Sequence, residues 1–219
     1  MRKTIATLCL AAATMTATVT GCGEPAPNTR GVYMLMDTSG TYSGELEKAQ
    51  QIINVVLTRL DTGDSFAVAR IDTGSFSEKD IIAKATFDER PSLANREKRQ
   101  FRELVTVFVD GVRPASHTDI TGGVLQAAEY LQEKGTGRKV IIIFSDLAED
   151  LKEGYVRDIP LSLDGFEVVA LNVTKLGSDN IDPRDYMKRL EDWKVRVEAS
   201  GGHWRVINDL DRLDPAFLG

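Results

Sequence analysis

The chain has 219 residues, and its 33 acidic residues outnumber its 27 lysines and arginines, so the formal net charge is −6 at pH 7. An acidic chain without a run of basic residues is a poor candidate for binding nucleic acid, and its surface is equally unsuited to anionic lipid headgroups. The two cysteines, Cys9 and Cys22, leave little material for a disulfide framework or for a cysteine-ligated metal.

The first segment of the chain predicts a targeting sequence. It starts with the basic residues Arg2 and Lys3 and continues over residues 5–19 with an apolar stretch too short and too polar for a membrane span. The end of this stretch, Val19-Thr20-Gly21-Cys22, resembles the signal of bacterial lipoproteins. That resemblance implies that residues 1–21 are removed and that lipid on Cys22 anchors the chain to a membrane of the bacterial cell envelope. An ordinary secretory signal with an incidental cysteine is the alternative.

The residues after the signal predict a short tether and one domain. Residues 22–29 hold the expected lipid-modified cysteine and two prolines. Gly23 is similar to the residue that accompanies outer-membrane retention in enteric lipoproteins, which implies the periplasmic face of the outer membrane in a Gram-negative host. Cys9 would leave with the signal, so we expect no free thiol and no redox chemistry. Residues 30–219 are enough for one domain with a sizeable core.

The first half of the domain alternates strand and helix patterns. The apolar run 32–36 predicts a strand buried on both faces, and the spacing of apolar residues over 44–60 predicts a helix. Residues 65–72 and 81–87 predict two more strands. The polar connection between these two strands is too short for a crossover, so we expect them to pair antiparallel at an edge of the sheet.

The second half continues the alternation and defines the fold class. Its predicted elements are, in order, a helix over 95–109, a helix over 119–134, a strand over 138–145, a loop containing Pro160, a strand over 166–173, a helix over 183–200 and a strand over 204–207. Alternating strands and helices predict an α/β fold with a doubly wound, mostly parallel sheet, one antiparallel edge strand and helices on both faces. Ligands of such sheets bind beyond the carboxyl ends of the strands.

Oxygen-bearing side chains follow two of the predicted strands and precede one helix. Asp37, Ser39 and Thr41 come directly after the first strand, Thr118 lies in the loop before the helix that starts near residue 119, and Asp146 follows the strand over 138–145. Carboxylate and hydroxyl oxygens suit a small hard cation such as Mg²⁺. We therefore expect a metal site at this edge, provided that the two strands are neighbours.

These residues resemble the metal-ion-dependent adhesion site of the von Willebrand factor type A (VWA) family, which reads Asp-x-Ser-x-Ser, then a distant Thr, then a distant Asp after a strand. The resemblance covers the chain from Arg30 to the C-terminus. Thr41 replaces the second Ser of the motif and keeps its hydroxyl, and Leu147 stands where the family usually has Gly, which leaves the shape of that loop open.

The resemblance also implies a function. Ser39 and Thr41 would contact Mg²⁺ directly, with Mn²⁺ or Ca²⁺ as alternatives. Thr118 would bind directly or through water, and Asp37 and Asp146 mainly through water, or one of them directly. An open coordination position would accept an Asp or Glu side chain of a protein partner. We therefore expect a non-enzymatic, protein-binding domain.

Other interpretations of the same residues stay open at this point. Asp37 to Thr41 is also typical of a plain turn, and Thr118 of a helix N-cap. The first motif is similar to that of haloacid dehalogenase-like Mg²⁺-dependent phosphatases, although Ser39 replaces their acid–base Asp and Lys139 is only an approximate match for their lysine. A structural envelope protein with a vestigial site is a third alternative. We expect His117 to face solvent, and the two tryptophans, Trp193 and Trp204, to belong to the core.

Overall fold

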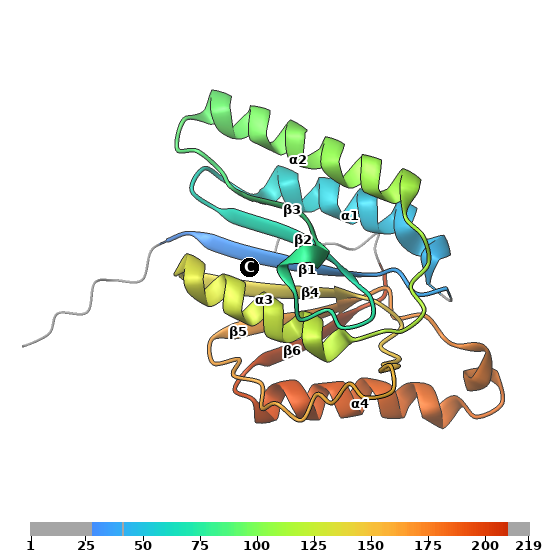
Figure 1. The fold of residues 1–219 in the computed structure, drawn as a ribbon. Helices are drawn as coiled ribbons and strands as arrows, with labels where there is room; N and C mark the ends of the chain where they lie inside the picture. Colours follow the sequence, from blue (N-terminus) through green and yellow to red (C-terminus); the bar gives the residue numbers. More distant parts are fainter. Residues whose placement is uncertain (1–27, 41, 210–219) are drawn as a thin grey trace, which may run out of the picture.

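The computed structural model, which describes residues 28–40 and 42–209, has one six-stranded sheet between two layers of helices (Figure 1). The strands are β1 (Arg30–Asp37), β2 (Ser65–Ile71), β3 (Ile81–Thr86), β4 (Arg138–Phe144), β5 (Phe166–Leu171) and β6 (His203–Ile207). The helices are α1 (Leu46–Arg59), α2 (Pro91–Gly111), α3 (Ile120–Lys134) and α4 (Pro183–Ala199), with 3₁₀ turns η1 (Ser43–Glu45), η2 (Glu78–Asp80) and η3 (Gly177–Asn180). The signal, Cys22 and Thr41 lie outside the described residues.

The strand order is β3-β2-β1-β4-β5-β6. Every neighbouring pair is parallel except β2 and β3, which confirms the predicted antiparallel edge strand and the doubly wound fold class. From the central strand β1 the chain first runs outward to β2 and β3, and then returns to the other side of β1 with β4. The direction of winding therefore reverses between β1 and β4, the type of position at which α/β sheets bind their ligands.

Two apolar clusters, one on each face of the sheet, form the core. Val32, Met34 and Met36 of β1 face α1 and α2, whereas Tyr33 and Leu35 face α3 and α4. All five side chains are at most 1 % exposed, as predicted for a central strand buried on both faces. Burial of one large apolar side chain contributes about 1.5–3 kcal/mol, so these clusters stabilise the position of β1 strongly. Both tryptophans lie in the α3–α4 cluster, as expected from the sequence.

The starts of α2 and α3 differ from the expectation in ways that have a physical reason. Helix α2 begins at Pro91, four residues before the predicted start, because proline suits the first turn of a helix, where its missing N–H is not needed. Asp119 is the N-cap of α3, and its Oδ1 accepts a hydrogen bond of 2.8 Å from the Gly122 N–H. The alternative interpretation of Thr118 as the N-cap is therefore wrong.

The connection from β4 to β5 lacks a helix. Parallel strands are usually joined through a helix, but residues 145–165 contain no helix or strand apart from an isolated bridge at Asp150. Buried Leu161 and Leu163 attach the end of this segment to the α3–α4 cluster, and the Leu163 N–H donates to the Ser200 carbonyl at 2.8 Å. These contacts hold the connection against the sheet, as packed helices hold the connections between other parallel strands.

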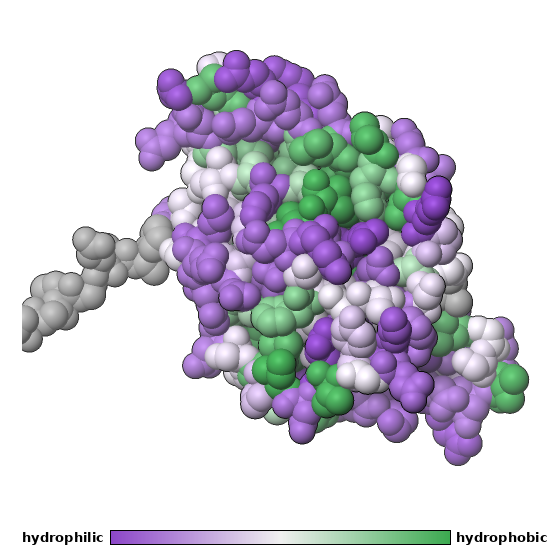
Figure 2. Space-filling view, viewed as in Figure 1, coloured by the Kyte–Doolittle hydropathy of each residue, from purple (hydrophilic) through white to green (hydrophobic). Residues whose placement is uncertain are grey.

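The surface of the described residues is largely polar. In the view of Figure 2 most of the molecule is hydrophilic, with apolar surface beside α2, where Leu104 and Val107 are exposed. None of the described helices combines the length and the apolar character that crossing a membrane would need.

Candidate metal-binding site

Asp37 is the point at which the ends of β1 and β4 meet. It is the last residue of β1, and its side chain is fully buried. The Ser145 hydroxyl, directly after β4, donates to Asp37 Oδ2 at 2.6 Å, and the Ser39 N–H donates to Oδ1 at 2.8 Å. Both carboxylate oxygens are therefore oriented, one by each of the two strand ends that the sequence placed at this edge.

The segment that carries Thr118 joins the same edge through its backbone. The Ala115 N–H donates to the Thr38 carbonyl at 2.8 Å, and Ser39 and Ala115 form an isolated parallel bridge. Thr118 forms an antiparallel bridge with Asp150, with N–H···O distances of 2.8 and 2.9 Å. The loop before α3 is thus tied at one end to the residues after β1 and at the other to the residues after β4.

Asp146 is held from two sides. It is 2 % exposed, and its Oδ1 accepts a hydrogen bond of 2.8 Å from the Ala148 N–H. Its carbonyl accepts a hydrogen bond of 3.3 Å from Arg189 Nε of α4. Arg189 also binds both carboxylate oxygens of buried Asp179 at 2.8 Å and holds the pKa of Asp179 at about 2. This ion pair fixes the arginine that orients the main chain of Asp146.

The charges of Asp37 and Asp146 both act on the hydroxyl of Tyr42. Burial raises its pKa far above the ordinary value of 10.0, a hydrogen bond from Asn172 lowers it, and the charges of Glu45, Asp37 and Asp146 raise it further. Both carboxylates are therefore close enough to Tyr42 for their charges to raise its pKa. Of the five predicted metal ligands, the structure places Asp37, Ser39, Thr118 and Asp146 on segments that contact one another at the carboxyl edge of β1 and β4.

The donor set suits a hard cation. Within residues 28–40 and 42–209 the carboxylate of Asp37 has no ion pair, although burying a carboxylate without a cation is costly. The neighbouring donors are hydroxyl and carboxylate oxygens, the ligand type that Mg²⁺ prefers. Within the described residues no group of three or more His, Cys, Asp or Glu side chains could hold a metal ion, at this edge or elsewhere. A cation at this edge would thus depend on the hydroxyls as well as on the two carboxylates.

Comparison with known proteins adds evidence on the fold. Neither a family model nor a curated protein matches the sequence. Among solved structures, the pilus adhesin SpaC from Lactobacillus rhamnosus GG, in an open conformation, matches 90 % of this chain with a TM-score of 0.56 and 12 % sequence identity. The chain corresponds to only 29 % of that adhesin.

A von Willebrand factor type A protein from Catenulispora acidiphila matches 88 % of the chain and 40 % of its own length, with 15 % identity and a TM-score of 0.46. BatB from Bacteroides thetaiotaomicron matches 86 % of the chain and 95 % of its own length, with 14 % identity and a TM-score of 0.44. The strand order and the antiparallel edge strand agree with the match to the pilus adhesin. The described chain has a VWA-like fold.

Leu147 stands where the VWA family usually has glycine, and its backbone adopts the conformation that glycine favours. Its φ is +65°, in the left-handed region that glycine adopts freely and that costs other residues about 1–2 kcal/mol. The Leu147 side chain is 2 % exposed in the α3–α4 cluster, and its carbonyl accepts a hydrogen bond of 3.2 Å from Trp193 Nε1. Burial of the side chain therefore offsets the strained backbone, which answers the question that the sequence left open about this loop.

The geometry weighs against the phosphatase alternative. Lys139 is the second residue of β4 and pairs with Gly31 at the start of β1. It therefore lies about 16 Å along the strand from Phe144 and the edge that carries Asp37. Lys139 cannot act together with Asp37 in one active site. His117 is partly exposed, and its Nδ1 lies 3.2 Å from Oδ2 of exposed Asp150.

Several residues that shape the site have no recognisable signal in the sequence. The Tyr42 hydroxyl donates to the Asn172 carbonyl at 2.6 Å, and Asn172 adopts a left-handed φ of +52°. Asn172 Nδ2 in turn donates to Glu45 Oε2 at 2.9 Å. Arg189 and the ion pair of Asp119 with Arg157 were also missed. Most of these contacts join residues far apart in the chain, and only Asp119 had a local signal, its position before a helix.

Proposed function

We propose that this VWA-like domain is a non-enzymatic, protein-binding module of the bacterial cell envelope. It would engage an Asp or Glu side chain of a partner through a divalent cation, Mg²⁺ or alternatively Mn²⁺ or Ca²⁺. The observation that supports the proposal is the meeting of three separate chain segments at residues 37–39, where the buried carboxylate of Asp37 has no ion pair within the described residues. A plain turn after β1 would not require the contacts with residues 115 and 145.

Each proposed ligand has a role in this arrangement. Ser39, Thr41 and Thr118 would offer neutral hydroxyl oxygens, while Asp37 and Asp146 would supply the negative charge that compensates the cation. Because only two carboxylates take part, a bound divalent cation would keep affinity for a further anionic oxygen. A partner carboxylate would meet this need, and such a desolvated contact can contribute a few kcal/mol at the centre of an interface.

Electrostatics makes the proposed binding strictly dependent on the cation. The chain carries a net charge of −6, and Glu45, Asp37 and Asp146 act on one hydroxyl at this edge. An acidic partner would be repelled by these charges without a cation. Chelation should therefore abolish binding rather than weaken it slightly.

The proposed attachment to the envelope is through lipid on Cys22. Each buried lipid CH₂ contributes about 0.8 kcal/mol, and stable anchoring takes more than one chain. The first described strand starts at Arg30, at the edge of the sheet opposite to Asp37. Such an anchor would leave the candidate site at the far edge from the point of attachment. Mass spectrometry of the protein purified from membranes would test the modification, and an unmodified Cys22 would refute it.

Titration calorimetry with Mg²⁺ and Mn²⁺ tests the cation site. We expect binding by the wild type and at least a tenfold loss in Ser39→Ala and Asp146→Ala. Ser92→Ala and Asp192→Ala are matched controls, because both side chains are exposed on helices and neither touches the site. If Ser39→Ala and Asp146→Ala bind both cations as tightly as the wild type, the proposed site is wrong.

A pull-down from envelope extract tests the partner. With Mg²⁺ present the wild type should retain a protein that EDTA releases and that fresh Mg²⁺ restores, whereas Ser39→Ala should retain none. Retention that survives EDTA would contradict a cation bridge. Metal-dependent hydrolysis of a generic phosphomonoester by the purified protein would contradict the non-enzymatic assignment.

A further inference from the structure

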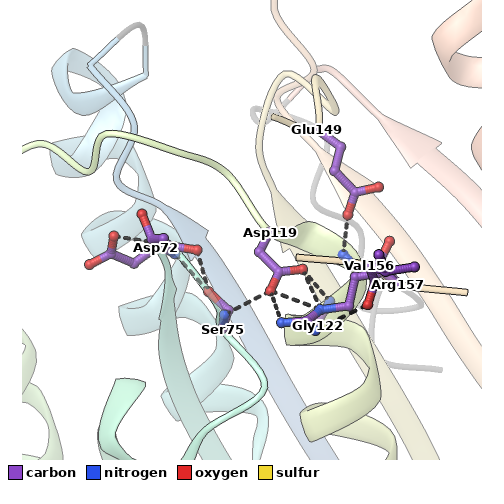
Figure 3. A network of polar contacts seen from close by, with 9 residues as sticks. Asp72, Ser75, Asp119, Gly122, Glu149, Val156 and Arg157 are labelled. Carbon is purple, nitrogen blue, oxygen red and sulfur yellow. Dashed lines mark hydrogen bonds and ion pairs between the residues drawn. The ribbon is translucent and has the colours of Figure 1, made fainter. Parts of the chain in front are cut away.

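A partly buried ion pair joins the helix-less connection between β4 and β5 to the start of α3. Arg157 Nε lies 3.0 Å from each carboxylate oxygen of Asp119, and Arg157 Nη2 lies 2.5 Å from Oδ2 (Figure 3). The Asp119 side chain is 1 % exposed and that of Arg157 is 14 % exposed. A two-pronged contact between a guanidinium and a carboxylate is strong and fixes the orientation of both groups.

Asp119 connects three parts of the chain. Besides binding Arg157, it caps α3 through the Gly122 N–H, and its Oδ2 accepts a hydrogen bond of 2.9 Å from the Ser75 N–H. Figure 3 shows these contacts converging on its carboxylate. Asp119 directly follows Thr118, the proposed ligand on this loop. The backbone of Thr118 is therefore set one residue away from a fully engaged, buried carboxylate.

The same connection reaches this turn at two further points. Glu149 Oε1 accepts a hydrogen bond of 2.7 Å from the Thr121 N–H, and Asp150 pairs with Thr118 through two backbone hydrogen bonds. Residues 146–150 thus run from one proposed ligand, Asp146, to the partner of another, Thr118. With no helix or sheet ladder of its own, this connection depends on such anchors to stay in place.

We propose that Arg157 is a positioning residue for the candidate metal site, and that its ion pair with Asp119 holds Thr118 in register with the residues that follow Asp146. The ligand role of Thr118 rests on the proposed function, whereas the mechanical coupling rests on the ion pair alone. Arg157 touches neither the cation nor the partner in this scheme. It acts through Asp119 and through the backbone bridge between Thr118 and Asp150.

Amide hydrogen exchange in the metal-free full chain tests the coupling without any cation. In Arg157→Gln the amides of Thr118 and Asp150 should exchange at least roughly tenfold faster than in the wild type, while amides in the middle of β1 should not change. Arg184→Gln is the matched control, because it removes the same charge from an exposed ion pair with Asp182. Unchanged protection of Thr118 and Asp150 in Arg157→Gln would overturn the proposal.

A second variant separates the ion pair from the helix cap. Asparagine is a good N-cap, so Asp119→Asn keeps an acceptor for the Gly122 N–H but loses the charge that binds Arg157. It should raise exchange of the same two amides, and the double variant Asp119→Asn/Arg157→Gln should exchange no faster than the worse single variant. Additive effects of the two substitutions would show that they act separately and would refute the ion pair as the cause.

Mn²⁺ titration links the coupling to the site. Arg157→Gln should bind Mn²⁺ at least about tenfold more weakly than the wild type, and Arg157→Lys, which keeps the charge but loses the two-pronged contact, should recover part of the affinity. Faster amide exchange with unchanged Mn²⁺ affinity would refute the positioning role. If the wild type binds no Mn²⁺, the proposed function fails, and the exchange measurement still decides whether Arg157 fixes Thr118.

Discussion

The two connections that leave the central strands β1 and β4 are held in place by different kinds of contact. After β1, residues 38–45 lead within a few positions into α1, and the backbone hydrogen bonds from Tyr42 N to Ser39 O and from Glu45 N to Tyr42 O lie within the connection itself. After β4, residues 145–165 cross to β5 without a helix and are held by the side chains of Trp193 and Arg189 of α4 and of Asp119, the N-cap of α3.

This difference between the two connections indicates where a substitution should disturb the candidate site most. The β1 connection is short and is continued by a packed helix, so one lost polar contact should change it little. The β4 connection is long, and several of its anchors are single side chains, so one substitution should change it much more. We therefore expect single substitutions to affect the β4 connection more strongly than the β1 connection.

The largest expected effect is at Leu147 of the β4 connection. Leu147→Ala and Leu147→Gly should each lower the free energy of unfolding by about 2–5 kcal/mol, because both lose a buried side chain. At φ +65° glycine is unstrained, so Leu147→Gly should be about 1 kcal/mol more stable than Leu147→Ala. Urea denaturation measures both differences.

Leu131 supplies the control for that pair of variants. It is also fully buried, but it lies inside α3, where glycine is about 1 kcal/mol worse than alanine. The order of the Gly and Ala variants should therefore reverse between the two positions. The same order at both positions would show that the left-handed conformation of Leu147 is not strained.

A divalent cation should join the two connections and stabilise the domain. At a Mg²⁺ concentration 100 times the dissociation constant, binding to the native state alone adds about 2.7 kcal/mol, which corresponds to about 5–10 °C in Tm for a domain of this size. Asp37→Ala should show no such shift, since it removes the carboxylate shared by both strand ends. A Mg²⁺-dependent shift that persists in Asp37→Ala would place the cation elsewhere.

A smaller effect is expected at Tyr42 of the β1 connection. Tyr42→Phe removes the hydrogen bond to the Asn172 carbonyl and should lower the free energy of unfolding by about 1–2 kcal/mol, measured by urea denaturation. Tyr130→Phe is the matched control, because within the described chain the buried Tyr130 hydroxyl has no hydrogen-bond partner. Its removal should be neutral or stabilising. Equal losses in both variants would mean that the Tyr42 hydrogen bond contributes nothing specific.

The smallest expected effect is the pH dependence of the Asp179–Arg189 anchor. Because Arg189 lowers the pKa of Asp179 from 3.8 to about 2, the ionised carboxylate contributes stability that is fully present above pH 3.8. This contribution should disappear as the pH falls through about 2. The urea midpoint of Asp179→Asn should therefore fall less than that of the wild type between pH 4 and pH 2. Asp192→Asn, an exposed carboxylate on α4, is the control and should follow the wild type.

Most of the fold was predictable because its signals are local. The apolar runs of β1 and β4, the helical spacing of α1 and α3, and the short link between β2 and β3 identify the elements and the antiparallel edge. The neighbouring positions of β1 and β4 follow once the sheet is doubly wound. The early start of α2 was missed because Pro91 was not recognised as a first-turn residue.

The contacts that complete the candidate site were not predictable in the same way. Arg157 binds Asp119 across 38 positions of sequence, and Tyr42 binds Asn172 across 130. Such side chains have no periodic pattern and no local spacing, because their partners are decided by packing. The sequence flagged Leu147 only as a departure from a motif, and its left-handed backbone became visible only with the structure.

The central position of β1 has a mechanical consequence. Its eight residues span about 23 Å from Arg30 to Asp37, with parallel partners along both sides. Tension between the N-terminal side of Arg30 and a load held near Asp37 would act along the axis of this strand. The hydrogen bonds to β2 and β4 would then be stretched together, in shear, instead of opening one after another. The strand that carries the first candidate ligand is thus also the element best placed to bear force.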